Sequence, residues 1–165
     1  MGDSGGMILN GEYNVSLDEK HRITLPAGLR NKLNVIFAVI TKGSDKCLWL
    51  YRNTDWEDKI ANVINEHTDP FSKKDLRLLR KYIAPSQDIE IDKAGRILIP
   101  QTLLEYADIS KDKGCVVLGA IDHIEIWDEK NYRDYCNEED ENNACEFEAA
   151  SEELSRRIKR QRGIE

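Results

Sequence analysis

The stretch LDEKHRITLP, at residues 17–26, recurs in the same pattern as IDKAGRILIP, at residues 91–100. Each copy reads apolar-Asp-x-x-x-Arg-apolar-x-apolar-Pro, and the two aspartates, Asp18 and Asp92, stand 74 positions apart (92 minus 18). A phrase repeated in this way indicates two copies of one structural unit. The sequence therefore predicts two tandem halves that pack about a pseudo-twofold axis. We expect them to share one core, because neither half alone holds many apolar residues.

Apolar and polar residues alternate on both sides of the Asp-x-x-x-Arg segment, and this alternation predicts a β-hairpin with the charged pair at its turn. Gly95 supplies the freedom for positive φ that a tight turn often needs. In the first copy His21 stands at the corresponding position, and His enters the left-handed region at some cost. Pro26 and Pro100 close the two copies and favour the first turn of a helix.

The rest of each half adds strands and helices. Residues 34–51 and residues 115–127 each read as strand, turn and strand. A capping box beginning at Thr54 predicts the start of one helix, and Ser72 is suited to cap a second helix, with Phe71 packing back onto it. Apolar residues at helical spacing in the tail predict a last helix whose apolar stripe needs a partner.

The length of 165 residues suits one or two small domains. We expect a leader or a disordered segment at residues 1–6, and an acidic linker with a C-terminal amphipathic helix at residues 136–165. Between them we expect a first repeat with linking helices at residues 7–84 and a second repeat at residues 85–135.

The net charge of −7 is unfavourable for binding nucleic acid, but it is spread unevenly. Residues 7–135 carry 19 Lys and Arg against 21 Asp and Glu, or −2, whereas residues 136–165 carry 5 against 9, or −4. The repeat region is therefore near neutral. Binding to DNA would depend on local basic patches and on several copies acting together.

Several classes of protein find no support in the sequence. No apolar run approaches the roughly 20 residues of a membrane span, and the start does not resemble a signal peptide. The chain has no Gly-rich phosphate loop of the Walker or Rossmann form, and its His and Cys residues form no nucleophile or metal motif. We therefore expect neither an enzyme nor a cofactor, and neither a bound metal nor a membrane protein.

The repeated Asp and Arg allow two interpretations. In the first, Asp bonds local N–H groups and Arg pairs with Asp, so that the segment is only a turn. In the second, matched arginines at two turn tips face a repeating anion, such as the phosphates and guanine edges of DNA. Repetition favours the second interpretation without excluding the first.

Taken together, the two Asp-x-x-x-Arg phrases resemble the MraZ family of bacterial regulators, which are of the AbrB/SpoVT type. Residues 11–13 (GEY) and 47–51 (CLWLY) are also similar to that family, and the resemblance covers roughly residues 7–135. It implies a β-rich α+β fold, in which two tandem AbrB-like swapped-hairpin units form a pseudo-twofold double-split β-barrel with flanking helices. The family usually has Gly where His21 stands, so the first loop is expected to differ in shape.

The resemblance also implies a function. It implies a sequence-specific, DNA-binding transcriptional regulator that acts on its own promoter, in the gene cluster for cell division and cell-wall synthesis. The partners would be double-stranded DNA with promoter repeats and further copies of the chain in a ring-like homo-oligomer, located in the cytoplasm and the nucleoid. The alternative is a non-enzymatic protein-interaction or antitoxin-like module with the same fold.

Eight residues of the two loops are the expected site. The residues expected to bind DNA are Lys20, Arg22, Lys93 and Arg96. The residues expected to orient the loops are Asp18, Asp92, His21 and Gly95. The first loop gathers Lys20 and Arg22 on one edge, so Arg22→Ala is expected to weaken DNA binding more than Arg96→Ala.

Overall fold

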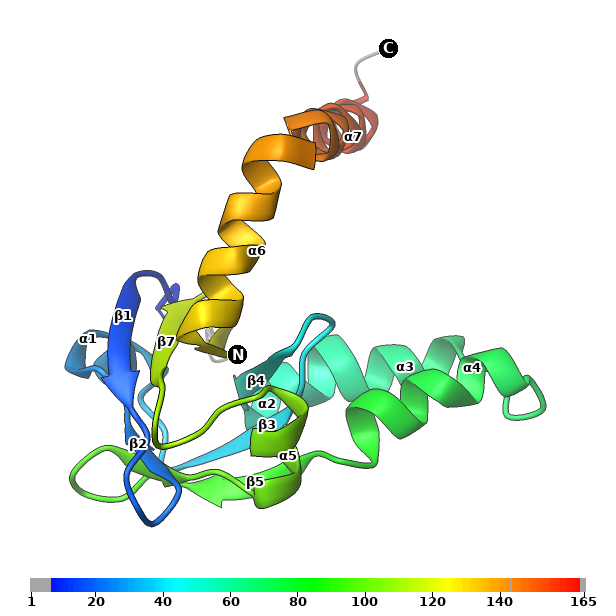
Figure 1. Cartoon of the computed structure of the whole chain (residues 1–165). Helices are drawn as coiled ribbons and strands as arrows, with labels where there is room; N and C mark the ends of the chain where they lie inside the picture. Colours follow the sequence, from blue (N-terminus) through cyan, green and yellow to red (C-terminus); the bar gives the residue numbers. More distant parts are fainter. Residues whose placement is uncertain (1–6, 143, 164–165) are drawn as a thin grey trace. The chain divides into compact units, whose positions relative to one another are not determined.

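The computed structural model describes residues 7–142 and 144–163, so the expected leader at residues 1–6 lies outside the described residues. The chain forms two compact units, one ending at Glu129 and one starting at Lys130. The first unit repeats one order of elements in each half (Figure 1). In the first half these elements are β1 (Glu12–Ser16), β2 (Arg22–Thr24), α1 (Ala27–Leu33), β3 (Phe37–Lys42) and β4 (Cys47–Arg52). In the second half they are β5 (Gln87–Glu90), β6 (Arg96–Leu98), α5 (Gln101–Tyr106), β7 (Gly114–Gly119) and β8 (His123–Asp128).

The strands form a six-stranded sheet in the order β1-β7-β8-β4-β3-β5 and a separate two-stranded ribbon of β2 and β6. Every pairing between these strands is antiparallel. The described residues therefore form a β-rich α+β fold, as predicted. Their large sheet is open at β1 and β5, and no closed barrel is found among them.

Each half supplies an edge strand to the other half. β1 pairs with β7, and β5 pairs with β3. At the centre β4 pairs with β8, where Trp49 lies opposite Glu125. From either edge, the sheet presents equivalent strands in the same order, which is the order expected from a pseudo-twofold axis between β4 and β8.

The prediction of a local hairpin at each repeated phrase is wrong. In the part of the chain that the structure describes, β1 and β2 pair with other strands and not with each other. Their loop is closed instead by two backbone hydrogen bonds, from the N–H of Asp18 to the carbonyl of Arg22 at 2.9 Å and from the N–H of His21 to the carbonyl of Asp18 at 3.1 Å. Alternation determines which face a side chain occupies, but it does not determine which strand lies beside it.

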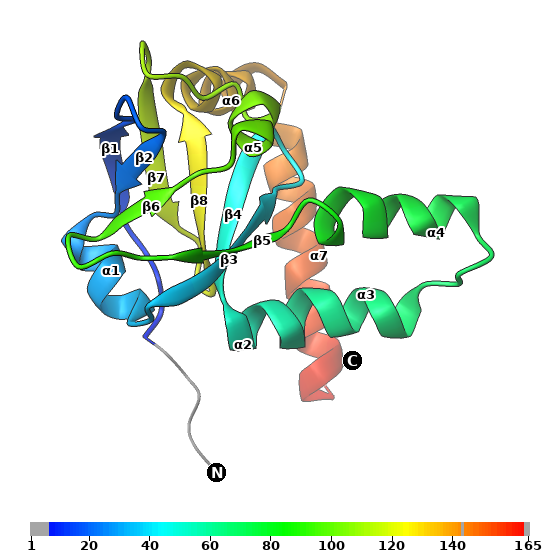
Figure 2. The ribbon, with the colours of Figure 1, turned by 90° about the horizontal axis from the view of Figure 1, so that it is seen from below.

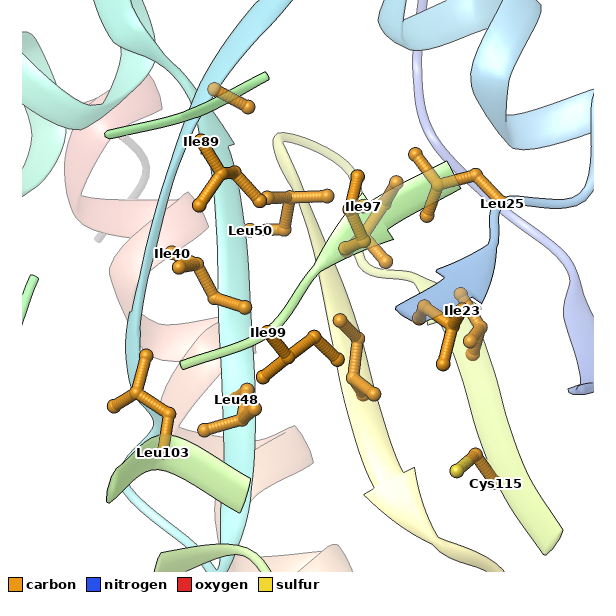
Figure 3. Close-up of a cluster of buried hydrophobic side chains, with 14 of the residues drawn as sticks. Ile23, Leu25, Ile40, Leu48, Leu50, Ile89, Ile97, Ile99, Leu103 and Cys115 are labelled. Carbon is orange, nitrogen blue, oxygen red and sulfur yellow. The ribbon is translucent and has the colours of Figure 1, made fainter. Parts of the chain in front are cut away.

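One hydrophobic core draws on both halves. It lies between the large sheet and a layer made of the β2–β6 ribbon with α1 and α5. Ile23 and Ile97 point from the ribbon toward sheet residues such as Ile40 and Leu50 (Figure 3). Both ribbon isoleucines have no exposed surface. The ribbon is thus held by the core as well as by its few hydrogen bonds.

The other face of the large sheet packs against a helical arm, which projects from the sheet in Figure 2. The arm consists of α2 (Asn53–Trp56), η1 (Glu57–Ala61), α3 (Asn62–His67), α4 (Lys73–Leu78) and η2 (Leu79–Ile83), of which η1 and η2 are π-helical. Val39 and Tyr51 of the sheet form a second buried cluster there with Trp56 of the arm.

The helix starts of the arm test three sequence predictions. Ser72 caps α4, because its hydroxyl accepts a hydrogen bond from the N–H of Asp75 at 3.2 Å. Thr54 does not cap, because α2 already begins at Asn53, directly after β4. Phe71 does not pack back onto α4, since 94% of its surface is exposed at the tip of the arm.

The second unit, taken by itself, consists of helices. α6 spans Glu129–Asn142 and α7 spans Ala144–Arg162. No helix within the described ranges has both the length and the apolar character needed to span a bilayer.

The burial of Ile97 gives a stability prediction with an internal control. Ile97→Ala should destabilise the protein by about 2–4 kcal/mol, because it removes a fully buried side chain and leaves a cavity. The next residue, Leu98, has 59% of its surface exposed. Leu98→Ala should therefore change the free energy of unfolding by less than about 0.5 kcal/mol. Urea denaturation measures both changes. An equal loss of unfolding free energy in the two variants would show that the ribbon does not pack against the core.

Candidate nucleic-acid interface

The two repeated phrases form matching loops between a sheet strand and the ribbon. In the first loop, one oxygen of the Asp18 carboxylate accepts hydrogen bonds from the N–H groups of Lys20 at 2.8 Å and Arg22 at 2.9 Å. Its other oxygen accepts a hydrogen bond from Nε of Arg22 at 2.9 Å. One carboxylate therefore shapes the turn and also holds the arginine side chain.

The second loop repeats this geometry. Asp92 accepts hydrogen bonds from the N–H groups of Ala94 and Arg96, both at 2.9 Å, and from Nε of Arg96 at 2.8 Å. In each loop, the N–H of the arginine and then its side chain hold the pKa of the aspartate below its usual value, although partial burial acts in the opposite direction. Both aspartates are thus ionised at neutral pH and paired with their own arginine.

His21 and Gly95 adopt the same unusual backbone conformation. Their φ angles are 61° and 81°, both in the left-handed region. The carbonyl of His21 accepts a hydrogen bond from the N–H of Ile99 at 3.0 Å, and that of Gly95 accepts one from Leu25 at 2.8 Å. The loops therefore turn alike, and the expectation that His21 would give the first loop a different shape is wrong. Each loop is also tied to the other repeat.

The outer face of the ribbon carries the two arginines. Arg22 lies opposite Leu98 and Thr24 lies opposite Arg96, while Ile23 and Ile97 between them face the core. Arg22 and Arg96 are therefore diagonal neighbours across the ribbon, about 7–8 Å apart at their Cα atoms. Their side chains are 26% and 41% exposed. Among the described residues, neither arginine uses its terminal Nη1 or Nη2 in a hydrogen bond.

The two lysines sit at the tips of the loops. Lys20 and Lys93 are both exposed. The carbonyl of Lys93 accepts a hydrogen bond from Nη2 of Arg30 in α1 at 2.7 Å. Arg30 also lies over the second loop, where a Cβ added to Gly95 would be 2.9 Å from its Cδ.

Arg30 is a cation of the site that the repeat could not reveal. Its counterpart in the second half, 74 positions on, is Leu104, which is buried in the core. The structure thus brings one additional guanidinium to the second loop alone, and the two loops differ in their charge.

A hollow of about 510 Å³ lies beside the ribbon, toward β5. The two arginines of the ribbon line it together with apolar residues that include Ile89 and Leu98. Its acidic lining residues are Asp88, Glu90 and Asp92. Within residues 7–142 and 144–163, no group of three His, Cys, Asp or Glu residues is placed to hold a metal ion. The arrangement offers paired guanidinium groups on a narrow ribbon, and it is suited to binding an anion or a base edge.

Comparisons with known proteins agree with the two-fold repetition. A family model described as "MraZ protein, putative antitoxin-like" matches twice, at residues 8–81 and 83–157. "Transcriptional regulator MraZ" of Treponema denticola is 41% identical over 146 residues, which cover 88% of this chain and 96% of that protein. The protein of the same name from Treponema pallidum (strain Nichols) is 38% identical over 144 residues, covering 87% and 92%. The solution structure of PHS018 from Pyrococcus horikoshii matches with a TM-score of 0.33 and 12% identity, over 70% of this chain and 94% of that one.

The left-handed residues of the two loops give a paired prediction. Gly95→Ala should destabilise the protein by about 1–2 kcal/mol, because an L-residue is strained at positive φ and its Cβ would press on Arg30. His21→Gly removes the same strain from the first loop. Its net gain should stay below about 1 kcal/mol, because glycine also makes the unfolded chain more flexible. Urea denaturation checks both signs, and a neutral Gly95→Ala would contradict the backbone geometry.

The aspartates give a prediction on pH. Their folded pKa values are lowered, so the hydrogen bonds to the loops are fully formed above the ordinary aspartate pKa of about 3.9 and are lost as the pH falls through the lower folded values. NMR should show the amide signals of Arg22 and Arg96 moving only in that acidic range. Asp92→Asn should abolish the transition of Arg96 and leave that of Arg22, and midpoints at or above the ordinary pKa would refute the paired geometry.

Proposed function

The chain belongs to the MraZ family, and on that basis we propose that it is a sequence-specific, DNA-binding transcriptional regulator without catalytic activity. The observation that carries this is the diagonal pair Arg22 and Arg96 on the outer face of the ribbon. The names of its relatives, which are called transcriptional regulators, give independent support.

The ribbon has the dimensions to read DNA. A two-stranded β-ribbon fits the major groove of B-DNA. The diagonal distance of about 7–8 Å between Arg22 and Arg96 is close to two base steps of about 3.4 Å each. Arg binds O6 and N7 of guanine with two parallel hydrogen bonds, and Asp18 and Asp92 occupy Nε alone, so each arginine keeps its Nη groups for a base.

The other loop residues have supporting roles in this proposal. Lys20 and Lys93 are exposed beside the arginines and would bind phosphates as point charges. Arg30 would add a third cation at the second loop. Asp18 and Asp92, with His21 and Gly95, would shape the loops and would not contact the DNA.

The near-neutral repeat region requires several copies to act together. One chain offers few phosphate contacts, so its affinity alone would be low. A ring-like homo-oligomer on a series of short direct repeats would multiply these contacts. The natural target is the promoter of the protein's own gene, in the cluster for division and cell-wall synthesis, and its location would be the cytoplasm and the nucleoid.

The strand exchange also supports a proposal on architecture. We infer that residues 7–84 and 85–135 are the two repeats of an AbrB-like, swapped-hairpin arrangement related to the double-split β-barrel. Its support is that β1 and β5 each pair with a strand of the opposite repeat.

A second candidate function is an antitoxin-like module that binds a partner protein. It is favoured by the description of the matching family model and by the exposed apolar residues of α7. Retention on heparin at low salt separates the two functions. A DNA-binding protein is retained and is eluted by salt, because binding to phosphates releases counterions.

Arginine variants test the reading of DNA. Arg22→Ala and Arg96→Ala should each weaken binding to the repeats upstream of the gene by about 1–3 kcal/mol. The loss should be larger for Arg22→Ala, because Arg30 leaves a cation beside the second loop when Arg96 is removed. Gel shifts on the repeats and on scrambled DNA measure the effect, and thermal melting confirms folding.

Two further variants serve as controls. Arg22→Lys keeps the charge but loses the bidentate contact, so it should reduce the preference for the repeats while the salt dependence of binding stays unchanged. Arg77→Ala, in α4 of the arm, should have no effect. Normal binding by a folded Arg22→Ala variant would show that the first loop is only a structural turn.

A further inference from the structure

α7 carries an apolar stripe that faces solvent. Phe147, Leu154 and Ile158 have 74%, 57% and 39% of their surfaces exposed. On a helix with 3.6 residues per turn, these three and Ala150 lie within about 40° of the direction of Leu154. An apolar stripe of this kind on an isolated helix gains free energy when another surface covers it.

Charged residues lie on both sides of the stripe, and they are acidic toward its N-terminal end and basic toward its C-terminal end. Glu148 and Lys159 lie on one side of the stripe, at about 120° and 140° from Leu154. Glu153 and Arg157 lie on the other side, at about 100° and 60°. On both sides the acidic residue precedes Leu154 and the basic residue follows it. The helix is thus acidic before its midpoint and basic after it.

We propose that α7 pairs in the antiparallel direction with α7 of a second copy of this chain, with Leu154 opposite itself. In this register a twofold axis brings the same side of each helix together. Glu148 lies about 9 Å before Leu154 and Lys159 about 7.5 Å after it, so Glu148 of one copy is level with Lys159 of the other. Glu153 comes within about one helical turn of Arg157 of the second copy in the same way. The stripe is covered, and Glu153 and Arg157 of the two copies form two ion pairs along one edge of the contact. Glu148 and Lys159 point away from the partner helix, but their opposite charges lie at the same level and still attract one another at longer range.

The distribution of charge along α7 favours the antiparallel direction, and it favours a second copy of α7 as the partner. In a parallel pair at the same register, the acidic halves of the two helices would face each other, and so would the basic halves, which is unfavourable. Glu153 already binds Arg157 within the helix at 3.2 Å, with 45% and 69% of the two side chains exposed. Both groups therefore remain accessible to a second helix, and a helix with the same sequence complements them.

Charge reversal in the full-length chain tests the pairing. The variant Glu148→Lys/Glu153→Lys has a basic helix, and the variant Arg157→Glu/Lys159→Glu has an acidic one. Each alone should lose about tenfold or more in self-association through α7, because its flanking pairs become repulsive. A mixture of the two variants should associate, and the variant with all four changes should regain self-association. Sedimentation measures the assembly, and circular dichroism confirms that the helices persist.

Cross-linking tests the direction. In a chain with Cys136→Ser and Cys145→Ser, the antiparallel register places residue 150 of one copy opposite residue 158 of the other. Mixed Ala150→Cys and Ile158→Cys chains should therefore form the mixed disulfide faster than either chain links to itself. Faster linkage of residue 150 to residue 150 would establish a parallel pair. An unchanged assembly of all charge variants, or no linkage at all, would show that a different surface covers the stripe, and each of these results overturns the proposal.

Discussion

The contact between Ile23 and Ile97 is the constraint on which the site depends. These two residues are paired at the centre of a ribbon whose strands are only three residues long, and both are fully buried. Because successive side chains of a strand point to opposite faces, their burial forces Arg22 and Arg96 onto the outer face. The pair of isoleucines also comes from both repeats, so neither repeat can present its arginine correctly without the other. Core and recognition surface are therefore two sides of the same short ribbon.

The aspartates of the loops act on orientation more than on stability. An ion pair as exposed as Asp18–Arg22 contributes little to the free energy of folding. Its value is geometric, because the same carboxylate accepts two backbone N–H groups and fixes Nε of the arginine. A guanidinium that is held before it meets its ligand loses less entropy on binding. The repetition of this geometry around Asp92 shows that the arrangement tolerates both Ala94 and Lys20 at the turn, and both Gly95 and His21 in the left-handed position.

Much of this could be predicted from the sequence, because the determinants are local. The repeated phrase predicted two equivalent halves and the Asp–Arg pairs, the family resemblance is confirmed, and Ser72 caps its helix as expected. The pairing of strands could not be predicted, because the alternating pattern does not identify a strand's neighbour. Thr54 failed as a cap because α2 begins directly after Arg52, whose buried guanidinium binds the carbonyls of Leu33 and Lys32. Arg30 could not be identified from the repetition, because the equivalent position of the second half is occupied by Leu104.

The exchange of edge strands has a consequence for how the protein is made. Glu12 of β1 pairs with Leu118 of β7, 106 positions later (118 minus 12). At translation rates of roughly 5–20 residues per second, β1 waits about 5–20 s before its partner leaves the ribosome. During that time an unpaired strand with a free backbone edge is exposed to other nascent chains. Neighbouring ribosomes on one messenger RNA would hold such chains close together. Correct folding is therefore favoured when the ribosomes are widely spaced along the messenger, or when a chaperone covers β1 until synthesis is complete.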